Sequence, residues 1–453
     1  MKITYLVSAI AVSVLLTGCL AAPVRDDSMV KNSIAMAGIG SPRLPGSGEA
    51  YLDDVWFAET LTLNRAVQAA LLNNPQVRAE LSRLDIAQAE LIQAGLISNP
   101  MLDFMLLRPN GGGRFELDYA LMQSLFDLFA RTSRIEVASA AQARVQAEVM
   151  MQLVRIAQDT EAAYYEAMAM KDALHLQREQ LVLEENTLSL LKRQAQQGVL
   201  SSSPVLTQQA TVSMQAHALR TAEAEQTQAL SALAQLLGLS SIHRLVLPDH
   251  LAPLQLAVLN EPELQALAQK YRPELSASNA SVEQMRAEKL LQSGAMRATE
   301  PSLGIAGMRD VDGMKLNGLA AKITLPIFDT GRARDTLANA NIAQAQYQAE
   351  AAQRLIPLQV ERALATLITN TKALEHADHH VRQQMQLETL ALRNYQQGVG
   401  DYLYLVEAKR LRLASQMEQL QAQQMLREAY VDLERATGMA IQSPGFNPVS
   451  ADS

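Results

Sequence analysis

The spacing of apolar residues changes several times along the chain. Residues 63–97 and 263–296 carry apolar side chains at helical spacing, and a proline interrupts each stretch. Residues 115–126 instead alternate with a period of two. The apolar set is Phe115, Leu117, Tyr119 and Leu121, and the intervening set is Glu116, Asp118, Ala120 and Met122. This pattern is typical of a strand with lipid on one side and water on the other.

Turn sequences separate two pairs of such stretches. Residues 100–108 and 115–126 flank the run Asn-Gly-Gly-Gly at 110–113, and residues 302–308 and 315–328 flank Asp-Val-Asp-Gly at 310–313. Glycine clustered with asparagine or aspartate is typical of β-hairpin turns. The alternation is weaker in the second pair. The pattern predicts two β-hairpins and therefore four strands.

The longest predicted elements follow each β-hairpin. Residues 132–197 contain neither glycine nor proline, and Pro357 is the only breaker within residues 332–397. At 1.5 Å per residue, a helix of about 66 residues is a rod of roughly 100 Å, too long for a compact domain. Each rod stops at a glycine, Gly198 or Gly398, before a second helical stretch at 203–237 or 402–437. The sequence thus predicts two antiparallel helical hairpins.

The order of these elements shows an internal duplication. The run Gln-Gln-Gly-Val occurs at 196–199 and again at 396–399, and the same offset of 200 relates Arg134 to Arg334 and Gly238 to Gly438. We therefore divide the chain into repeats at residues 61–240 and 261–440. Residues 241–260 form a linker between the repeats, and residues 441–453 form a flexible tail.

The N-terminus has the pattern of an export signal. A lysine and a short apolar run precede Leu-Thr-Gly-Cys at residues 16–19, which is similar to the cleavage site of bacterial lipoproteins. Cys19 is the only cysteine among 453 residues. We interpret residues 1–18 as a lipoprotein signal peptide, Cys19 as the lipidated residue and residues 19–60 as an extended linker. An ordinary secretory signal with a chance cysteine is the alternative.

Composition excludes several other functions. A single cysteine leaves no internal disulfide and no cysteine-based metal cluster. The net charge of −8 and the lack of a basic patch with interleaved aromatics argue against nucleic acid as a partner. No nucleotide-binding loop or catalytic constellation is evident, so we expect neither a cofactor nor an enzyme. Aromatic residues are only 4% of the chain, which suits long packed helices.

The four predicted strands require an assembly if they lie in a membrane. Beyond residue 19, no run approaches eighteen apolar residues, so a span would have to be made of strands. An open sheet edge in lipid leaves backbone groups unpaired at a cost of several kcal/mol each. Two chains would supply eight strands with a filled interior, whereas three would supply twelve strands around a pore.

Several runs in this order resemble the TolC-type outer-membrane efflux protein family. They are Asn-Pro at 74–75, Leu-Pro-Ile-Phe-Asp at 325–329 followed by Gly331, Tyr-Gln-Gln-Gly-Val-Gly at 395–400 and Leu-Val-Glu-Ala at 405–408. The resemblance implies a mainly α fold with a small β part. Long antiparallel helical hairpins would form a periplasmic tunnel, and four strands per chain would contribute to a twelve-stranded trimeric outer-membrane β-barrel.

The same resemblance implies the partners and the location. It implies a homotrimer in the outer membrane of a Gram-negative bacterium, joined through a periplasmic adaptor (membrane fusion) protein to an inner-membrane resistance-nodulation-division pump. Residues 93–100, Gln-Ala-Gly-Leu-Ile-Ser-Asn-Pro, are similar to members that serve heavy-metal exporters. The leading function is a passive exit duct for toxic small molecules or metal ions. The alternative is a structural or adhesive coiled-coil lipoprotein, which would have no use for the strand hairpins.

The resemblance also suggests functional residues at the ends of the helical hairpins. The turns expected to contact the adaptor contain Gly198, Val199, Leu200, Gly398, Val399 and Gly400. A glycine there lets two backbones approach closely, although it also simply permits the turn. Leu403 would narrow the closed periplasmic end, and three copies of Glu407 would form an acidic ring there. Alternatively, Glu407 and Arg410 form an ordinary surface pair at i,i+3 spacing.

A histidine cluster offers a weaker candidate. His376 and His380 share a helix face at i,i+4 spacing, which can hold a metal ion. A solvated helix face is the alternative. The run His-Ala-Asp-His-His at 376–380 lacks the glutamate that follows the first histidine in zinc proteases.

Overall fold

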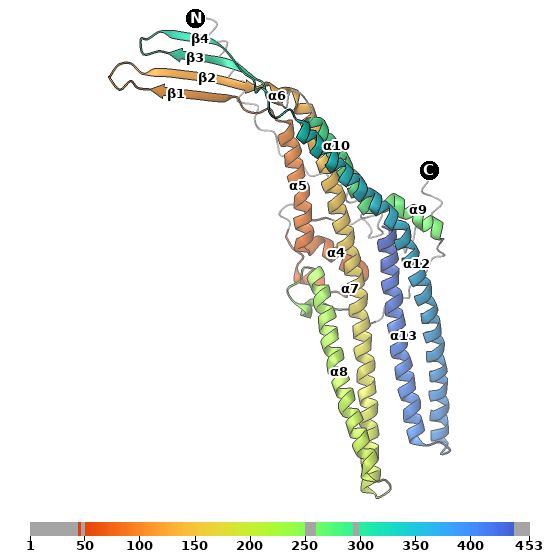
Figure 1. Cartoon of the computed structure of the whole chain (residues 1–453). Coiled ribbons are helices and arrows are strands. Elements are labelled where there is room, and N and C mark those ends of the chain that lie inside the picture. Colours follow the sequence, from red (N-terminus) through yellow and green to blue (C-terminus); the bar gives the residue numbers. More distant parts are fainter. Residues whose placement is uncertain (1–43, 47–49, 250–259, 293–298, 439–453) are drawn as a thin grey trace.

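The computed structural model describes residues 44–46, 50–249, 260–292 and 299–438. The molecule is elongated, with a small sheet at one end and long helices extending away from it (Figure 1). Among these residues, no helix combines the length and the apolar character needed to cross a membrane. The predicted fold class, long helical hairpins with a small four-stranded part, is confirmed.

The elements occur in nearly the same order in the two halves of the chain. The first half contains α3 (Asp54–Phe57), α4 (Leu63–Asn73), α5 (Pro75–Gly95), β1 (Met101–Leu107), β2 (Glu116–Ser124), α6 (Leu125–Phe129), α7 (Arg131–Gln196), α8 (Ser202–Leu236) and η2 (Ile242–Arg244). The second half contains α9 (Glu261–Tyr271), α10 (Pro273–Gln292), β3 (Ser302–Arg309), β4 (Lys315–Lys322), α12 (Arg332–Gln396) and α13 (Tyr402–Thr437). We call α7 with α8 the first helical hairpin and α12 with α13 the second.

The four strands form one antiparallel sheet in the order β1-β2-β3-β4. Tyr119 on β2 pairs with Gly307 on β3, which in turn pairs with Asn317 on β4. The Tyr119 hydroxyl crosses over β3 and donates to Asn317 Oδ1 at 2.7 Å. A Cβ atom at Gly307 would come within 2.5 Å of the Tyr119 ring, so this crossing requires glycine at position 307.

Two predicted strands extend too far at their C-terminal ends. Strand β2 ends at Ser124 because the Ser124 hydroxyl accepts from the Asp127 backbone N–H at 3.2 Å and so caps α6. Strand β4 ends at Lys322 rather than at residue 328. Pro326 lies in the segment that follows and has no N–H to donate to a strand partner. Phe328 in this segment is fully exposed in the single chain.

Pro357 does not interrupt the second rod, and the predicted long helix is confirmed. Helix α12 continues through it from Arg332 to Gln396. A proline inside a helix removes one backbone hydrogen bond and costs about 3 kcal/mol. Ile356 and Val360 on either side are 2% and 0% exposed in the core shared with α13, and their burial offsets that cost.

The core of the described residues consists of two large apolar clusters and a small third one near the second tip, formed by Ala391, Leu405 and Ala408. The larger packs α4 and α5 on α7, and the second packs α9 on α12 and α13. Helix α13 also lies directly against α7, so the two helical hairpins stand side by side (Figure 1). The free ends of both hairpins therefore point away from the sheet.

Candidate functional site

The turns of both helical hairpins have the same pattern of backbone hydrogen bonds. In the first, the Gly198 N–H donates to the Ala195 carbonyl at 3.0 Å and the Val199 N–H donates to the Gln194 carbonyl at 2.9 Å. This pattern places the glycine in the left-handed region, with φ of 72° at Gly198 and 71° at Gly398. Glycine is required at both positions by the backbone conformation.

The second tip carries side-chain features that differ from those of the first. The rings of Tyr395 and Tyr402 pack edge to face at 5.5 Å across the turn. The Asp401 carboxylate accepts from the Leu403 N–H at 3.2 Å and caps α13. A Cβ atom at Gly400 would meet Asn394 Cβ at 3.0 Å, so position 400 is crowded. Leu200 occupies the corresponding position of the first tip.

The predicted adaptor-contact residues are at the surface. Val199 and Val399 are among the most exposed apolar side chains of the helical hairpins. Within the described chain, nothing lies within 4 Å of a Cβ built at Gly198 or Gly398. Both turns are therefore accessible to a partner in the single chain.

The predicted gate residues lie on the first two turns of α13, directly after the second tip. Leu403 and Glu407 are both exposed in the single chain. Glu407 Oε2 accepts from Arg410 Nη1 at 3.4 Å, which is the i,i+3 pair expected as the alternative. In the first hairpin the equivalent residues are Ser203 and Thr207, and the Thr207 hydroxyl donates to the Ser203 carbonyl at 3.2 Å.

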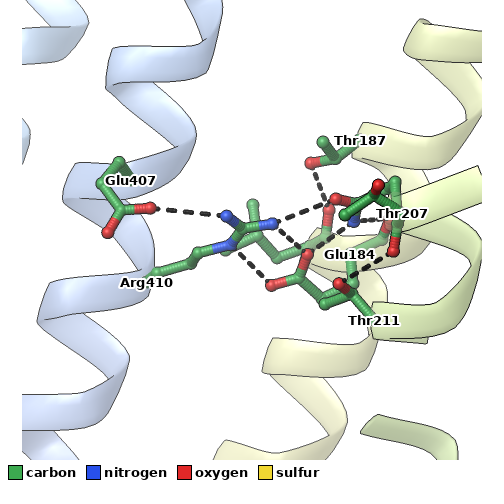
Figure 2. Close-up of polar contacts among 8 residues, drawn as sticks. Glu184, Thr187, Thr207, Thr211, Glu407 and Arg410 are labelled. Carbon is green, nitrogen blue, oxygen red and sulfur yellow. Dashed lines mark hydrogen bonds and ion pairs between the residues drawn. The ribbon is translucent and has the colours of Figure 1, made fainter. Parts of the chain in front are cut away.

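Arg410 has a second and stronger set of contacts that the sequence did not reveal. From α13 its guanidinium reaches Glu184 on α7 (Figure 2), where Nε donates to Oε1 at 2.8 Å and Nη2 donates to Oε2 at 2.5 Å. Gln208 on α8 also donates to Glu184 Oε2, at 2.6 Å. We call these three residues the brace, because they join the two helical hairpins close to the gate residues.

The acidic residue of the brace, Glu184, is buried. Glu184 is only 1% exposed, whereas Arg410 remains partly accessible. Burial alone would raise the pKa of the Glu184 carboxyl, but the hydrogen bonds from Arg410 and Gln208 outweigh it and hold the pKa below its usual value. The same contacts raise the pKa of Arg410. The pair is therefore fully charged at neutral pH.

Two further ion pairs join the same helices. Arg412 lies 3.6 Å from Glu179, and Arg435 lies 2.6 Å from Asp159. We call the α7–α13 contact the seam. At the brace and at these two pairs, α7 supplies an acid and α13 supplies an arginine. The seam thus carries three acid–arginine contacts between residues 159 and 184 of α7.

The brace could not be predicted from the sequence. Glu184 and Arg410 are 226 residues apart, and neither lies in a recognisable motif. The sequence suggested Arg410 only as a local partner of Glu407. The one usable signal is that neither charge has a counterpart in the other repeat. By the offset of 200, Gln384 corresponds to Glu184 and Ala210 corresponds to Arg410.

One of the two histidine candidates, His380, is engaged in other contacts. His380 Nδ1 lies 3.0 Å from Glu418 Oε2, and its Nε2 lies 3.1 Å from Gln384 Nε2. Within the described residues, no group of three or more histidine, cysteine, aspartate or glutamate side chains comes together to hold a metal ion. A metal ion at His376 and His380 would have to displace these contacts. Cys19, the predicted lipidation site, lies outside the described residues.

Comparison with known proteins places these features in a family. The family model described as outer membrane efflux protein matches residues 66–239 and 254–439, which is more than half of the chain. The toluene efflux pump outer membrane protein TtgF of Pseudomonas putida is 25% identical over an alignment that covers 100% of both chains.

Solved structures share the fold. The CmeC outer membrane channel of Campylobacter jejuni has a TM-score of 0.68 at 16% identity, covering 91% of this chain and 93% of its own. The outer membrane protein VceC of Vibrio cholerae has a TM-score of 0.66 at 18% identity, with coverages of 83% and 96%.

Proposed function

The chain belongs to the outer membrane efflux protein family, and we propose that three identical copies form a passive export duct with a closable periplasmic end. It is an outer-membrane channel component of an efflux pump in a Gram-negative bacterium. Its family is one of channels and not of enzymes. The cargo of the proposed duct is a toxic small molecule or a metal ion, driven by a separate pump.

The sheet supports sharing of a barrel between copies. Strands β1 and β4 are its two edges, and each would need a partner strand in lipid. One face carries exposed apolar side chains from all four strands, including Phe104, Leu121, Ile305 and Leu319, and suits contact with lipid. The opposite face carries Asp103 and Asp118. Twelve strands from three copies would enclose a pore lined by that second face.

The brace is the observation that best supports a closable end. It holds α13 against the first helical hairpin close to Leu403 and Glu407. With three copies around one axis, Leu403 would narrow the opening and the Glu407 carboxylates would converge. Release of Arg410 would free the tip end of α13 to move outward and widen that opening.

The exposed tips support contact with a second protein. We assign the turns at Gly198-Val199-Leu200 and Gly398-Val399-Gly400 to a periplasmic adaptor that connects the duct to an inner-membrane resistance-nodulation-division pump. Both turns present an exposed valine beside a glycine with open space around it. An α-helical hairpin of a partner could therefore approach the backbone closely at either turn.

Lipid at Cys19 would add a second attachment to the outer membrane. The proposal rests on the run Leu-Thr-Gly-Cys at 16–19 and on the lack of any other cysteine in the sequence. Palmitate labelling of cells should mark the wild type and not Cys19→Ser, while both remain in the outer membrane because a barrel anchors far more strongly than acyl chains. Equal labelling of the variant would refute lipidation.

The gate assignment can be tested with the purified protein in planar bilayers. Glu407→Ala should weaken cation selectivity, because it removes the converging charges. Leu403→Ala should raise conductance without changing selectivity, because it removes bulk and no charge. The matched control is Thr207→Ala, at the equivalent position of the first hairpin. If all three variants conduct like the wild type, the constriction lies elsewhere.

A further inference from the structure

One face of the small sheet carries both acids and methionines. We call the face that holds Asp103 and Asp118 the acidic face. The four strands contain four methionines, and the register places all of them on the acidic face: Met101, Met105, Met122 and Met308. The large apolar side chains of the opposite face are leucine, isoleucine, phenylalanine and tyrosine. Apolar packing alone gives no reason for methionine to be restricted to one face.

Methionine is also unexpected on this face because of what the face would contact. The inside of an outer-membrane barrel is normally polar. In the proposed duct the acidic face lines the pore, so its methionines contact water and not lipid. Burial in lipid therefore does not account for them. A thioether sulfur is, however, a ligand for soft metal ions.

Two of the methionines and one of the acids lie in a single row across three strands. Met105 on β1 pairs with Asp118 on β2, which in turn pairs with Met308 on β3. Directly opposite residues on neighbouring antiparallel strands have Cβ atoms about 4.5–5.5 Å apart. A methionine side chain also has three rotatable bonds. The two sulfur atoms can therefore lean over the Asp118 carboxylate from its two sides.

A cavity of about 760 Å³ adds a second carboxylate to this row. The neighbouring row on the same face consists of Asp103, Ala120, Ala306 and Gly318. Three of these four residues are small, so they leave open space beside the larger Met105, Asp118 and Met308. Both rows line the cavity. One ligand in this space can thus meet two thioether sulfur atoms and two carboxylates.

One oxygen of the Asp118 carboxylate has no hydrogen-bond partner among the described residues. This oxygen, Oδ1, is buried. A buried carboxylate oxygen without a donor or a cation is unfavourable. Lys322 is the one basic side chain that the strands place on the acidic face, and it lies six residues along β4 from Leu316, which is in the row of Asp118. At about 3.3 Å per residue the separation is about 20 Å, too far for an ion pair.

We propose that Met105, Asp118 and Met308 bind a soft monovalent metal ion, Cu⁺ or Ag⁺, with Asp103 adding negative charge beside it. Thioether sulfur selects such ions over the hard ions that prefer ligands of oxygen alone. The Asp118 carboxylate offsets the charge of the ion. The position of the site in a pore rests on the proposed function, whereas the ligand set belongs to a single chain. In the duct, the metal ion is the cargo.

Equilibrium dialysis of the purified full-length protein against silver nitrate tests the site, in chloride-free buffer because silver chloride is insoluble. Met105→Leu and Met308→Leu keep an apolar side chain of similar volume and remove the sulfur. Each should weaken Ag⁺ binding at least about tenfold, which is the lower end of the loss for groups that only support a metal ligand. Asp118→Asn should weaken it too. The matched control is Met314→Leu, at an exposed methionine between β3 and β4, which should bind Ag⁺ like the wild type.

The outcomes separate this site from other cation sites. Cys19 is present in every variant, so its own affinity for silver cancels in the comparison. An organic cation would bind beside leucine as well as beside methionine, because it uses apolar surface and charge. Unchanged Ag⁺ binding in both leucine variants therefore overturns the proposal. A loss in Asp118→Asn alone also overturns it, because that result indicates a carboxylate site without sulfur ligands.

Planar bilayers distinguish failure of the site from failure of the duct. Ag⁺ should lower the sodium nitrate conductance of the wild type, because the bound ion lies in the pore, and should lower that of Met105→Leu less. A wild type that conducts but binds Ag⁺ no better than the leucine variants keeps the duct and overturns the site. A wild type that does not conduct but binds Ag⁺ through Met105 and Met308 refutes the duct and retains the site.

Discussion

The two helical hairpins turn through nearly the same backbone and carry different side chains beside the turn. Gly198 and Gly398 have the same left-handed conformation and the same pattern of backbone hydrogen bonds. Two turns further along, the first hairpin has Thr207 and Gln208, whereas the second has Glu407 followed by Arg410. The two repeats therefore share the glycine that the turn conformation requires, but they differ in the charged residues beside it.

This divergence makes the brace an asymmetric contact. The first hairpin supplies the buried acceptor Glu184 and its amide partner Gln208, and the second supplies the donor Arg410. Position 210, the counterpart of Arg410, is an alanine. Each hairpin carries only one of the two charged residues of the contact.

The largest effect is expected from removing the arginine of the brace. Arg410→Ala leaves the buried Glu184 carboxylate without its cation, which costs about 3–5 kcal/mol for a buried pair. Thermal unfolding of the helices should show this loss, and the trimer should conduct more in planar bilayers because α13 is released. Arg354→Ala is the control, since the Arg354–Glu350 pair is exposed and such pairs contribute about 0–1 kcal/mol.

Because of the brace, we expect the conductance of the trimer to rise at acid pH. The folded pKa of Glu184 is lowered, so its stabilisation is present above the unfolded value of 4.5 and is lost as pH falls through the folded pKa. The wild type should therefore show a conductance increase at low pH that Arg410→Ala lacks. Retention of the full acid response in the variant would assign that response to other groups.

The sequence predicts the architecture well because the architecture depends on local signals. The glycines at 198 and 398, the absence of breakers over residues 132–197 and the alternation around Tyr119 each specify an element through its own neighbours. The offset of 200 then shows that the elements occur twice. The ends of β2 and β4 were missed because Ser124 begins a helix through its cap, and because apolar residues continue after Lys322 outside the strand.

The contacts between the repeats could not be predicted in the same way. Glu184 with Arg410, and Asp159 with Arg435, are pairs whose partners lie in different halves of the chain. A helical pattern gives the face on which a residue lies, but not the residue opposite it on another helix. The predicted rod through Pro357 is confirmed, and burial of the neighbours of Pro357 against α13 keeps α12 continuous.

The smallest effect on stability, and the sharpest comparison between the two hairpins, is expected at the tips. A non-glycine residue at Gly198 or Gly398 has space but adopts a left-handed conformation, at a cost of about 1–2 kcal/mol. Gly398→Ala and Gly398→Trp share this strain, and only tryptophan adds bulk. Crosslinking to the adaptor and toxicant resistance should therefore fall in Gly398→Trp and stay near wild type in Gly398→Ala.

Gly198→Trp should have a weaker effect, because Val399 is more exposed than Val199 and the Tyr395–Tyr402 pair gives the second tip a larger apolar surface. Equal losses in Gly398→Ala and Gly398→Trp would show that the turn conformation, and not close approach of a partner, is what the glycine provides.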